Sequence, residues 1–491
     1  MVLSASFPPL DLGPLSLVAL VPLFWLWRAA PPREAALIGF VFGVGYYGAL
    51  LEWTRYFGVV AIVPLVAAVA AFIALTGLLV AAFAQRGMRS PWLTAAIWVL
   101  VEGLKDRFPL GGLPWGDLGV SLHDVPAARA LASFGGVPLV SFAVVACNAL
   151  VLDAVVGARR SDPRRFARAA VALGLLVVIT LTADVTRYDP PVTGRIHFAL
   201  LQGNDQNREL TQREVADQYL TRKHLRLAAK LHGRYDLIVF PESALENDPE
   251  RDPTLRAELV DVAAAHDAVV LANARTEAPD GGLYNANLAY DPNGHLQGIY
   301  AKQHLVPFGE YVPWRDQLSF IGELKQVPYD YERGHTRRLF RAAGHPFATV
   351  ICFESAFGSL VRDFVRAGAE AIVVTTNNRS YRRSALSAQH LAFSQMRAAE
   401  TGRPVLHASI SGITGVVDAD GDVRDTSELF VNKITTGTIA TRSGETPYVR
   451  FGEWVLLLCA AGCVIAAAGA AWRTRRTAPV DSARAQEARS G

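Results

Sequence analysis

Long apolar runs without charge divide the chain into two kinds of sequence. Residues 58–84 hold 27 successive positions without a charge, residues 130–152 hold 23, and residues 454–471 hold 18. About 20 helical residues cross a hydrocarbon core of ~30 Å. Shorter apolar stretches lie at residues 13–27, 35–51, 91–104 and 169–183. A soluble core could bury one such helix but not seven, so we predict a multi-pass membrane protein with seven spans.

Short basic loops give the predicted orientation of these spans. Arginines cluster at four places: Arg28 and Arg33, Arg86 and Arg89, Arg159 to Arg168, and Arg473 to Arg476. Threading seven spans places all four clusters on the same side of the membrane. Cytoplasmic loops carry an excess of Lys and Arg, so that side is predicted to be cytoplasmic. The N-terminus and residues 186–450 are then expected on the extracytoplasmic face of the cytoplasmic (inner) membrane.

Residues 186–450 have a different pattern, in which short β-rich runs alternate with amphipathic stretches. The expected strands are Ile196–Leu201, Leu237–Phe240, Ala268–Ala272, Ala348–Cys352, Ala371–Thr375 and Val405–Ala408, and the expected helices are 212–232, 253–266 and 387–401. This alternation predicts a layered α/β domain. We therefore expect a transmembrane helical domain of about six spans at 1–185, the α/β domain at 186–450, a last span at 451–473 and a disordered cytoplasmic tail at 474–491.

Composition and charge exclude several classes of protein. Hydrophobic residues make up 51% of the chain and charged residues 19%, below the usual 25% or so, which argues against a disordered chain. A net charge of +3 is too small to indicate nucleic-acid binding. The four cysteines include no CxxC pair and no Cys/His zinc spacing, so we predict neither a disulfide scaffold nor a metal site.

Three short motifs in the α/β segment carry candidate chemistry. Glu242 follows the predicted strand Leu237–Phe240, where ligands gather in α/β sheets. Lys302 and Glu310 bracket an apolar loop rich in Pro and Gly. Cys352 ends another apolar strand, with Glu354 two residues later. Taken singly, each motif also has a structural interpretation: a surface glutamate, a solvated lysine, or a cysteine packed as a small apolar residue.

The three motifs together resemble those of the nitrilase superfamily, whose Glu–Lys–Cys triad would be Glu242, Lys302 and Cys352. With the apolar spans around them, the chain resembles the apolipoprotein N-acyltransferases from about Pro8 to Trp472. Pro114-Trp115 and Gln202-Gly-Asn204 support this resemblance. It implies an extracytoplasmic α-β-β-α sandwich attached to the helical bundle. An N-terminus outside the membrane without a leading positive charge is unusual. We therefore expect either a first span that inserts as a reverse anchor or a further span upstream of Met1, which would give the family's usual eight helices.

The resemblance also implies a reaction. Cys352 would attack a phospholipid acyl donor to form a thioester, and the α-amine of a diacylglyceryl-cysteine lipoprotein would accept the acyl group. Glu242 would act as general base, and Lys302 would stabilise the thiolate and the oxyanion. Glu310 and Glu354 would orient the site or hold Lys302. This chemistry needs no metal and no cofactor, and the lipid character of both substrates accounts for the bilayer-embedded spans.

Three segments depart from the family pattern. Residues 377–383 lack the usual aromatic pair and glycine, Phe353 replaces the usual tyrosine, and residues 205–210 lack the usual tryptophan. These changes bear on substrate choice and rate. Arg379, Arg382 and Arg383 suit an anionic phospholipid headgroup, since Arg pairs well with phosphate, and a solvated basic loop is the alternative.

Two other functions stay open on the sequence alone. A membrane-anchored amidase of the nitrilase type would use the same triad, with water resolving the acyl-enzyme. The high Ala and Arg content and the stretch from Gln389 to Glu400 look actinobacterial. In that lineage the enzyme can be joined to a polyprenol-phosphate mannosyltransferase. A non-catalytic partner of such a glycosyltransferase is therefore the second alternative.

Overall fold

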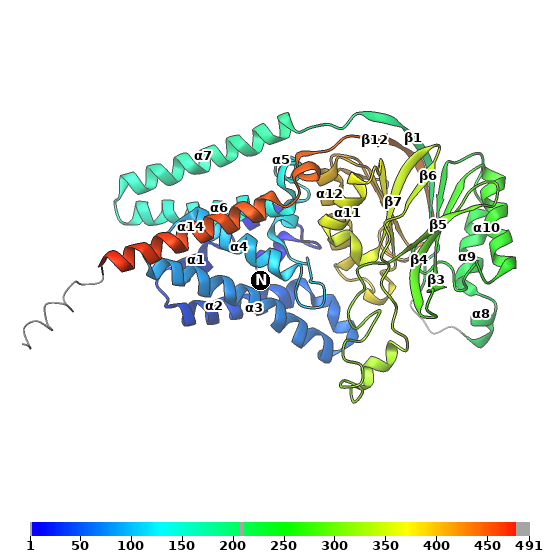
Figure 1. Ribbon diagram of the computed structural model, residues 1–491, viewed down its shortest axis with the longest axis horizontal. Coiled ribbons are helices and arrows are strands. Elements are labelled where there is room, and N and C mark those ends of the chain that lie inside the picture. The colour runs from blue at the N-terminus through cyan, green and yellow to red at the C-terminus, as the bar shows by residue number, and fades with distance from the viewer. Residues whose placement is uncertain (1, 207–210, 478–491) are drawn as a thin grey trace, which may run out of the picture.

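The computed structural model describes residues 2–206 and 211–477, which form a helical bundle and an α/β domain packed end to end (Figure 1). The segment 205–210, which lacks the tryptophan usual in the family, lies partly outside the described residues, at 207–210. The predicted disordered tail begins at residue 474, but the last helix continues to Thr477. Residues 478–491 of that tail also lie outside the described residues.

A helix stands at each stretch predicted to span the membrane, although the first is split. The bundle contains α1 (Val21–Trp27), α2 (Pro32–Leu50), α3 (Val59–Gln85), α4 (Pro91–Lys105), α5 (Pro126–Ala130), α6 (Ala132–Arg159), α7 (Pro163–Thr186) and α14 (Trp454–Thr477). Its 3₁₀ turns are Leu3–Ser6, Gly13–Leu17, Glu52–Phe57 and Leu118–Leu122. Residues 13–27 form a 3₁₀ turn followed by α1, because Pro22 has no N–H with which to continue a helix.

Four of the described helices, α3, α6, α7 and α14, are long and apolar enough to cross a membrane. Helix α7 exposes most of its large apolar side chains, among them Val177, Val178 and Ile179. Helix α14 likewise exposes Leu457 and Ile465. An aqueous surface rarely carries contiguous apolar patches of this size, so these faces are suited to lipid.

The α/β domain consists of two six-stranded sheets. The first has the order β12-β1-β2-β3-β4-β5 and the second β11-β10-β9-β8-β7-β6. The strands of the first are β1 (Val192–Gln202), β2 (Leu237–Val239), β3 (Val269–Glu277), β4 (Leu283–Tyr290), β5 (Leu296–Ala301) and β12 (Lys433–Arg442). Those of the second are β6 (Leu339–Ala342), β7 (His345–Ile351), β8 (Ala371–Thr376), β9 (Val405–Ser409), β10 (Gly415–Val417) and β11 (Val423–Arg424).

Each sheet has a parallel centre and antiparallel edges. Strands β1, β2 and β3 are parallel neighbours, as are β7, β8 and β9. The runs Leu237–Val239 and Ala371–Thr376 are wholly buried, as expected for strands covered on both faces. The strand predictions made for these runs are confirmed.

Helices cover the outer face of each sheet and complete an α-β-β-α sandwich (Figure 1). The helices are α8 (Gln212–Ala216), α9 (Tyr219–Ala228), α10 (Pro253–His266), α11 (Gly358–Arg366), α12 (Leu386–Thr401) and α13 (Pro447–Phe451), with 3₁₀ turns at Gly322–Gln326, Cys352–Ala356 and Arg379–Tyr381. Helices α9 and α10 cover the first sheet on the side away from the bundle, and α11 and α12 lie between the second sheet and the bundle. The predicted combination of membrane helices and a nitrilase-like α/β sandwich is confirmed.

Helix α12 of the α/β domain makes hydrogen bonds to the helical bundle. Its Gln389 accepts hydrogen bonds from the indole N–H groups of Trp53 (3.0 Å) and Trp115 (2.8 Å), and donates to the carbonyls of Pro8 and Leu50 (both 3.1 Å). All four partners belong to the bundle and its loops. One side chain of the α/β domain therefore joins three separate segments of the bundle.

A kink in α6 makes a second junction. Gly135 and Gly136 leave the helical conformation, and Gly136 has φ +69°. A side chain at Gly136 would collide with the Tyr448 ring, since its Cβ would lie 2.6 Å from that ring. Glu400 of α12 accepts from the backbone N–H of Val137 (2.9 Å), just after the kink. Glycine is therefore required where the bundle meets the domain.

Candidate active site

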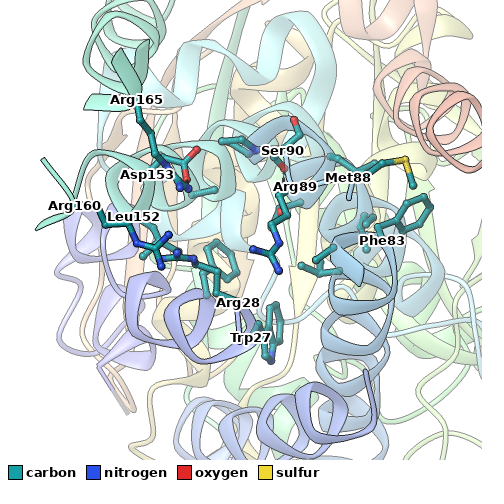
Figure 2. Close-up of a pocket in the computed structure, with 18 residues that line it drawn as sticks. Trp27, Arg28, Phe83, Met88, Arg89, Ser90, Leu152, Asp153, Arg160 and Arg165 are labelled. Atoms are coloured by element: carbon teal, nitrogen blue, oxygen red, sulfur yellow. Dashed lines mark hydrogen bonds and ion pairs between the residues drawn. The ribbon is translucent and has the colours of Figure 1, made fainter. Parts of the chain in front are cut away.

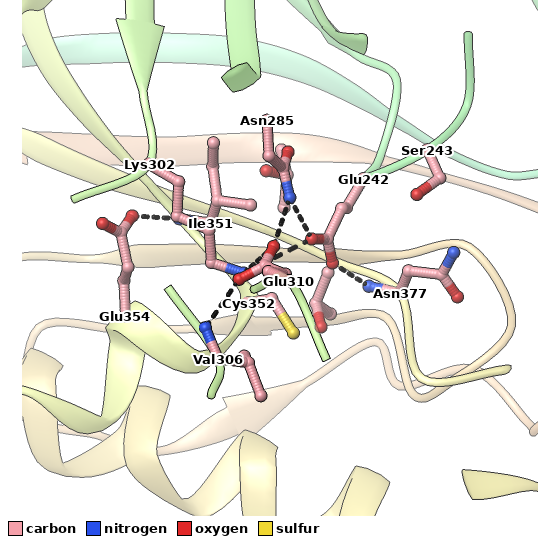
Figure 3. Close-up of polar contacts among 12 residues, drawn as sticks. Glu242, Ser243, Asn285, Lys302, Val306, Glu310, Ile351, Cys352, Glu354 and Asn377 are labelled. Atoms are coloured by element: carbon pink, nitrogen blue, oxygen red, sulfur yellow. Dashed lines mark hydrogen bonds and ion pairs between the residues drawn. The ribbon is translucent and has the colours of Figure 1, made fainter. Parts of the chain in front are cut away.

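The structure brings Glu242, Lys302 and Cys352 to one place at the ends of strands from both sheets (Figure 3). Glu242 follows β2, Lys302 follows β5, and Cys352 follows β7. The Lys302 ammonium lies 3.6 Å from the Glu242 carboxylate. The Cys352 thiol interacts electrostatically with both groups. Residues far apart in the sequence thus converge because the two sheets face each other.

Lys302 is a buried cation held between two carboxylates. Its side chain is 1% exposed, and its Nζ donates to Glu310 Oε1 at 2.8 Å. Burial disfavours the ammonium, but Glu310 and Glu242 outweigh this effect and raise the lysine pKa above its ordinary value. Lys302 therefore stays charged across the physiological pH range and supplies a fixed positive charge beside Cys352.

Cys352 occupies a sharp turn. Strand β7 ends at Ile351, and Cys352 begins a 3₁₀ turn with φ +52°, a left-handed conformation that costs non-glycine residues about 1–3 kcal/mol. Burial, together with the charge of Glu242, raises the pKa of the thiol to about 12, against the opposing effect of Lys302. The resting thiol is therefore protonated, and a base must take its proton as it attacks.

Glu242 is placed to be that base. Burial raises the pKa of its carboxyl, while Lys302 acts in the opposite direction. Its Oε1 accepts from Asn285 (2.8 Å), and its Oε2 accepts from the backbone N–H of Asn377 (2.7 Å). A raised pKa brings a carboxylate closer to the range in which it exchanges protons at neutral pH.

Glu310 and Glu354 have different surroundings. Glu310 holds Lys302 and also accepts from the backbone N–H of Val306 (2.8 Å), which closes the loop between them. Glu354 accepts from the Tyr300 hydroxyl (2.9 Å) and from the backbone N–H groups of Gln303 (2.6 Å), His304 (3.1 Å) and Ile351 (2.8 Å). Glu354 thus ties the Lys302 loop to the turn at Cys352, whereas Glu310 contacts the lysine directly.

Two residues at the site do not stand out in the sequence. Asn285 of β4 donates to both Glu242 and Glu310 (2.8 Å each) and sets their carboxylates around Lys302. His390 of α12 lies 2.9 Å from the Cys352 carbonyl oxygen and 2.9 Å from the Ser355 hydroxyl. Asparagine is depleted in strands. The two asparagines at alternating positions 285 and 287 of a strand are therefore the one sequence feature that could have pointed to Asn285. Nothing local marks His390.

The three arginines of the departing segment contact different partners. Arg379 forms an ion pair with Asp205 (2.8 Å). Arg382 lies over the Tyr56 ring and Arg383 over the Phe430 ring, at 5.0 and 5.6 Å. Both Arg382 and Arg383 are exposed. Arg382 and Arg383 are therefore accessible to solvent, whereas Arg379 is paired with a carboxylate.

The same segment also carries an aromatic side chain. Tyr381 packs edge-on against Trp53 (5.2 Å between ring centroids) and Phe57 (5.4 Å) of the bundle. Trp115, from the loop after α4, stacks on Phe353 with the ring planes 14° apart. The bundle therefore supplies aromatic side chains that pack against Phe353, the residue after Cys352, and against Tyr381.

Comparison with known proteins identifies both parts of the chain. The family model of the apolipoprotein N-acyltransferase N-terminal domain matches residues 1–150, and that of the carbon-nitrogen hydrolases matches residues 199–448.

Several relatives match over nearly their whole length. The apolipoprotein N-acyltransferase of Methylococcus capsulatus is 32% identical, with 94% of this chain and 93% of the relative covered. The protein of the same name from Nitrosomonas europaea is 31% identical, with 96% of each chain covered. That of Geobacter metallireducens is 28% identical, with 95% and 93% covered. The chain belongs to the apolipoprotein N-acyltransferase family.

Proposed function

We propose that this protein transfers an acyl chain from a membrane phospholipid, through a thioester on Cys352, to the α-amine of a diacylglyceryl-cysteine at the N-terminus of a lipoprotein. The observation that carries the proposal is the convergence of Glu242, Lys302 and Cys352 beside a bundle of apolar helices. The names of the relatives agree with it. A lipid substrate also accounts for the bundle, since extracting an acyl chain into water costs about 0.8 kcal/mol per CH₂.

In the first step Glu242 takes the thiol proton while the Cys352 sulfur attacks the ester carbonyl carbon of the phospholipid. The S–C bond forms, and the negative charge that develops on the carbonyl oxygen is stabilised by Lys302. The ester C–O bond then breaks, and the protonated Glu242 returns its proton to the departing oxygen. A lysophospholipid leaves, and Cys352 remains as the thioester.

In the second step the lipoprotein α-amine attacks the thioester carbonyl. Glu242 takes a proton from the amine nitrogen, and the C–S bond breaks to release Cys352, which recovers a proton. An amide bond replaces the thioester, and no oxidant, reductant or cofactor enters the balance. Lys302 stays charged throughout, because Glu310 remains paired with it at 2.8 Å.

We also propose the orientation predicted from the sequence, with the α/β domain on the extracytoplasmic face of the cytoplasmic membrane and the division at residues 185, 450 and 473. The turn between α6 and α7 and the end of α14 lie at the end of the bundle away from the α/β domain (Figure 1). The basic clusters are therefore on the opposite side from the site, in accord with the excess of Lys and Arg in cytoplasmic loops.

The exposed Arg382 and Arg383 are proposed to contact an anionic headgroup of the donor, whereas the ion pair with Asp205 occupies Arg379. A polyprenol-phosphate mannosyltransferase partner stays a prediction from the family resemblance.

The test is an acyl-transfer assay. Purified protein in detergent is incubated with phosphatidylglycerol or phosphatidylethanolamine and a diacylglyceryl-cysteine peptide, and the peptide is weighed by mass spectrometry. The proposal predicts a gain of one acyl chain that disappears with Cys352→Ala. Release of free fatty acid without peptide acylation would instead indicate hydrolysis by a nitrilase-type enzyme. Absence of both products, in protein that elutes as a folded species, would contradict the proposal.

A further inference from the structure

A cavity lies in the bundle, and Cys352 is not among the residues that line it. It has a volume of about 130 Å³ and is formed by α1, α3, α4, α6 and the start of α7 (Figure 2). By the measure of 10–15 Å³ per water, this space holds on the order of ten water-sized groups. That is enough for a phosphate group and the glycerol attached to it.

Four arginines line this cavity, with a single carboxylate among them (Figure 2). They are Arg28, Arg89, Arg160 and Arg165, and the carboxylate is Asp153. Arg165 forms an ion pair with Asp153. Among the described residues, no carboxylate forms an ion pair with the other three arginines. Around this cavity, three arginines are therefore without an ion-pair partner in the part of the chain that the structure describes.

These charges repel one another. Burial and the charges of Arg165, Arg160 and Arg89 lower the pKa of the Arg28 guanidinium, and only Asp153 acts in the opposite direction. The guanidinium carbon of Arg28 lies 5.7 Å from the Trp25 ring centroid. An anion placed between these arginines would remove the repulsion and gain charge-assisted hydrogen bonds, and the planar guanidinium suits phosphate oxygens in particular.

The remaining wall of the cavity is mostly apolar. Phe24, Trp27, Val80, Phe83, Leu93, Ile97 and Leu152 contribute to it. Trp27 is 1% exposed, and its indole N–H has no acceptor among the described residues. Trp27 therefore contributes a buried aromatic ring to this wall. A basic rim above an apolar wall fits a ligand that has both a phosphate and an acyl chain.

The cavity sits at the end of the bundle away from the α/β domain. Arg28 follows α1, Arg89 lies in the turn between α3 and α4, and Arg160 and Arg165 flank the turn between α6 and α7. Basic pockets between membrane helices at the cytoplasmic surface bind anionic lipid headgroups. With the orientation proposed above, the site is at the opposite membrane face from Cys352, too distant to receive the acyl donor of the reaction.

We propose that this cavity binds the phosphate of an anionic phospholipid of the cytoplasmic leaflet through Arg28, Arg89 and Arg160, with its acyl chain along the wall that contains Phe83 and Trp27. The lipid joins the three helix turns that carry these arginines. The shared chemistry is a phosphate group, and the acyl chain distinguishes a lipid from free phosphate.

The test is native mass spectrometry of delipidated, purified protein with a phosphatidylglycerol whose chains are ether-linked, which cannot donate an acyl group to Cys352. Diacylglycerol and inorganic phosphate are the two other ligands tested. The cavity variant is R28Q/R89Q/R160Q, and the matched control is R86Q/R164Q/R168Q. The control removes the same charge from exposed arginines near the same turns that do not line the cavity.

The proposal predicts that the cavity variant loses one ether-lipid binding step, weakened at least about tenfold, since one lost hydrogen bond to a charged group contributes that much. Ether lipid bound at the donor site near Cys352 should be the same in both proteins. The control variant should bind the ether lipid as tightly as the unaltered protein does. Diacylglycerol, which has no phosphate, should bind the unaltered protein no more tightly than the ether lipid binds the cavity variant. Arg89→Gln alone, in an exposed turn, should weaken binding in the same direction and guards against misfolding of the triple variant. Equal binding by both triple variants would overturn the proposal. Displacement of the lipid by an equal concentration of inorganic phosphate would overturn its lipid part.

Discussion

Replacing Gln389 with leucine is expected to destabilise the junction between the α/β domain and the bundle. The side chain is 4% exposed and makes four hydrogen bonds to the bundle. Leucine has a similar size but leaves the indole N–H groups of Trp53 and Trp115 buried without an acceptor. It also leaves the carbonyls of Pro8 and Leu50 with one donor fewer.

The structure gives a magnitude for this loss. Each buried donor left without a partner costs about 1–3 kcal/mol, so the two indoles alone predict a loss of about 2–6 kcal/mol. A loss of 1 kcal/mol lowers the melting temperature of a domain of 150–250 residues by roughly 2–4 °C. Thermal unfolding in detergent, followed by circular dichroism, should therefore show a melting temperature at least about 4 °C lower.

Gln395→Leu is the matched control. Gln395 lies on the same helix, is also 4% exposed, and also crosses to a bundle residue, through a donated bond to Asp124 (2.8 Å). Its replacement leaves no buried N–H without an acceptor, so a much smaller loss is expected. Equal losses in the two variants, or an unchanged melting temperature for Gln389→Leu, would refute this explanation of how the domains are joined.

Three further predictions concern the site itself. Glu354→Gln should lower stability by about 1–3 kcal/mol in thermal unfolding, because an amide N–H₂ would face donors that now contact a carboxylate; an unchanged melting temperature would contradict this. Lys302→Met should slow alkylation of Cys352 at neutral pH at least about tenfold, since a nearby opposite charge shifts a pKa by about 1–3 units, whereas an unchanged rate would show that the lysine does not favour the thiolate. Because burial raises the pKa of Glu242 above 4.5 and the base must be ionised, kcat/KM should fall on acidification at a pH above 4.5, and a fall only at more acidic pH would exclude Glu242 as the base.

The parallel centres of both sheets could be predicted from sequence because they are buried on both faces. Strands β2 and β8 consist of continuous apolar runs, and Glu242 stands just beyond the first of them. The ends of such runs also locate the site, since polar side chains there gather at one edge of the sandwich. Glu242 and Cys352 could therefore be located from the sequence, whereas Lys302 follows β5, which is no such run, and was expected only from its Pro- and Gly-rich loop and the family resemblance.

The antiparallel edges and the contacts between domains could not be predicted in the same way. Strands β4, β5 and β12 mix polar and apolar residues and depend on pairing with distant neighbours, so Asn285 does not stand out. Gln389 lies in a stretch correctly predicted to be helical, but its four partners are at least 274 positions away. Such contacts are set by tertiary packing, which leaves no local pattern.

The role of Cys352 as the nucleophile is tested by the intact mass of the protein after incubation with phosphatidylethanolamine or phosphatidylglycerol in the absence of an acceptor. We predict an added mass of one acyl chain on the peptide that contains Cys352. Hydroxylamine should remove it, as it removes a thioester, and Cys352→Ala should not acquire it. An acyl adduct that persists in Cys352→Ala, or no adduct in folded unaltered protein, would contradict the assignment of Cys352 as the nucleophile.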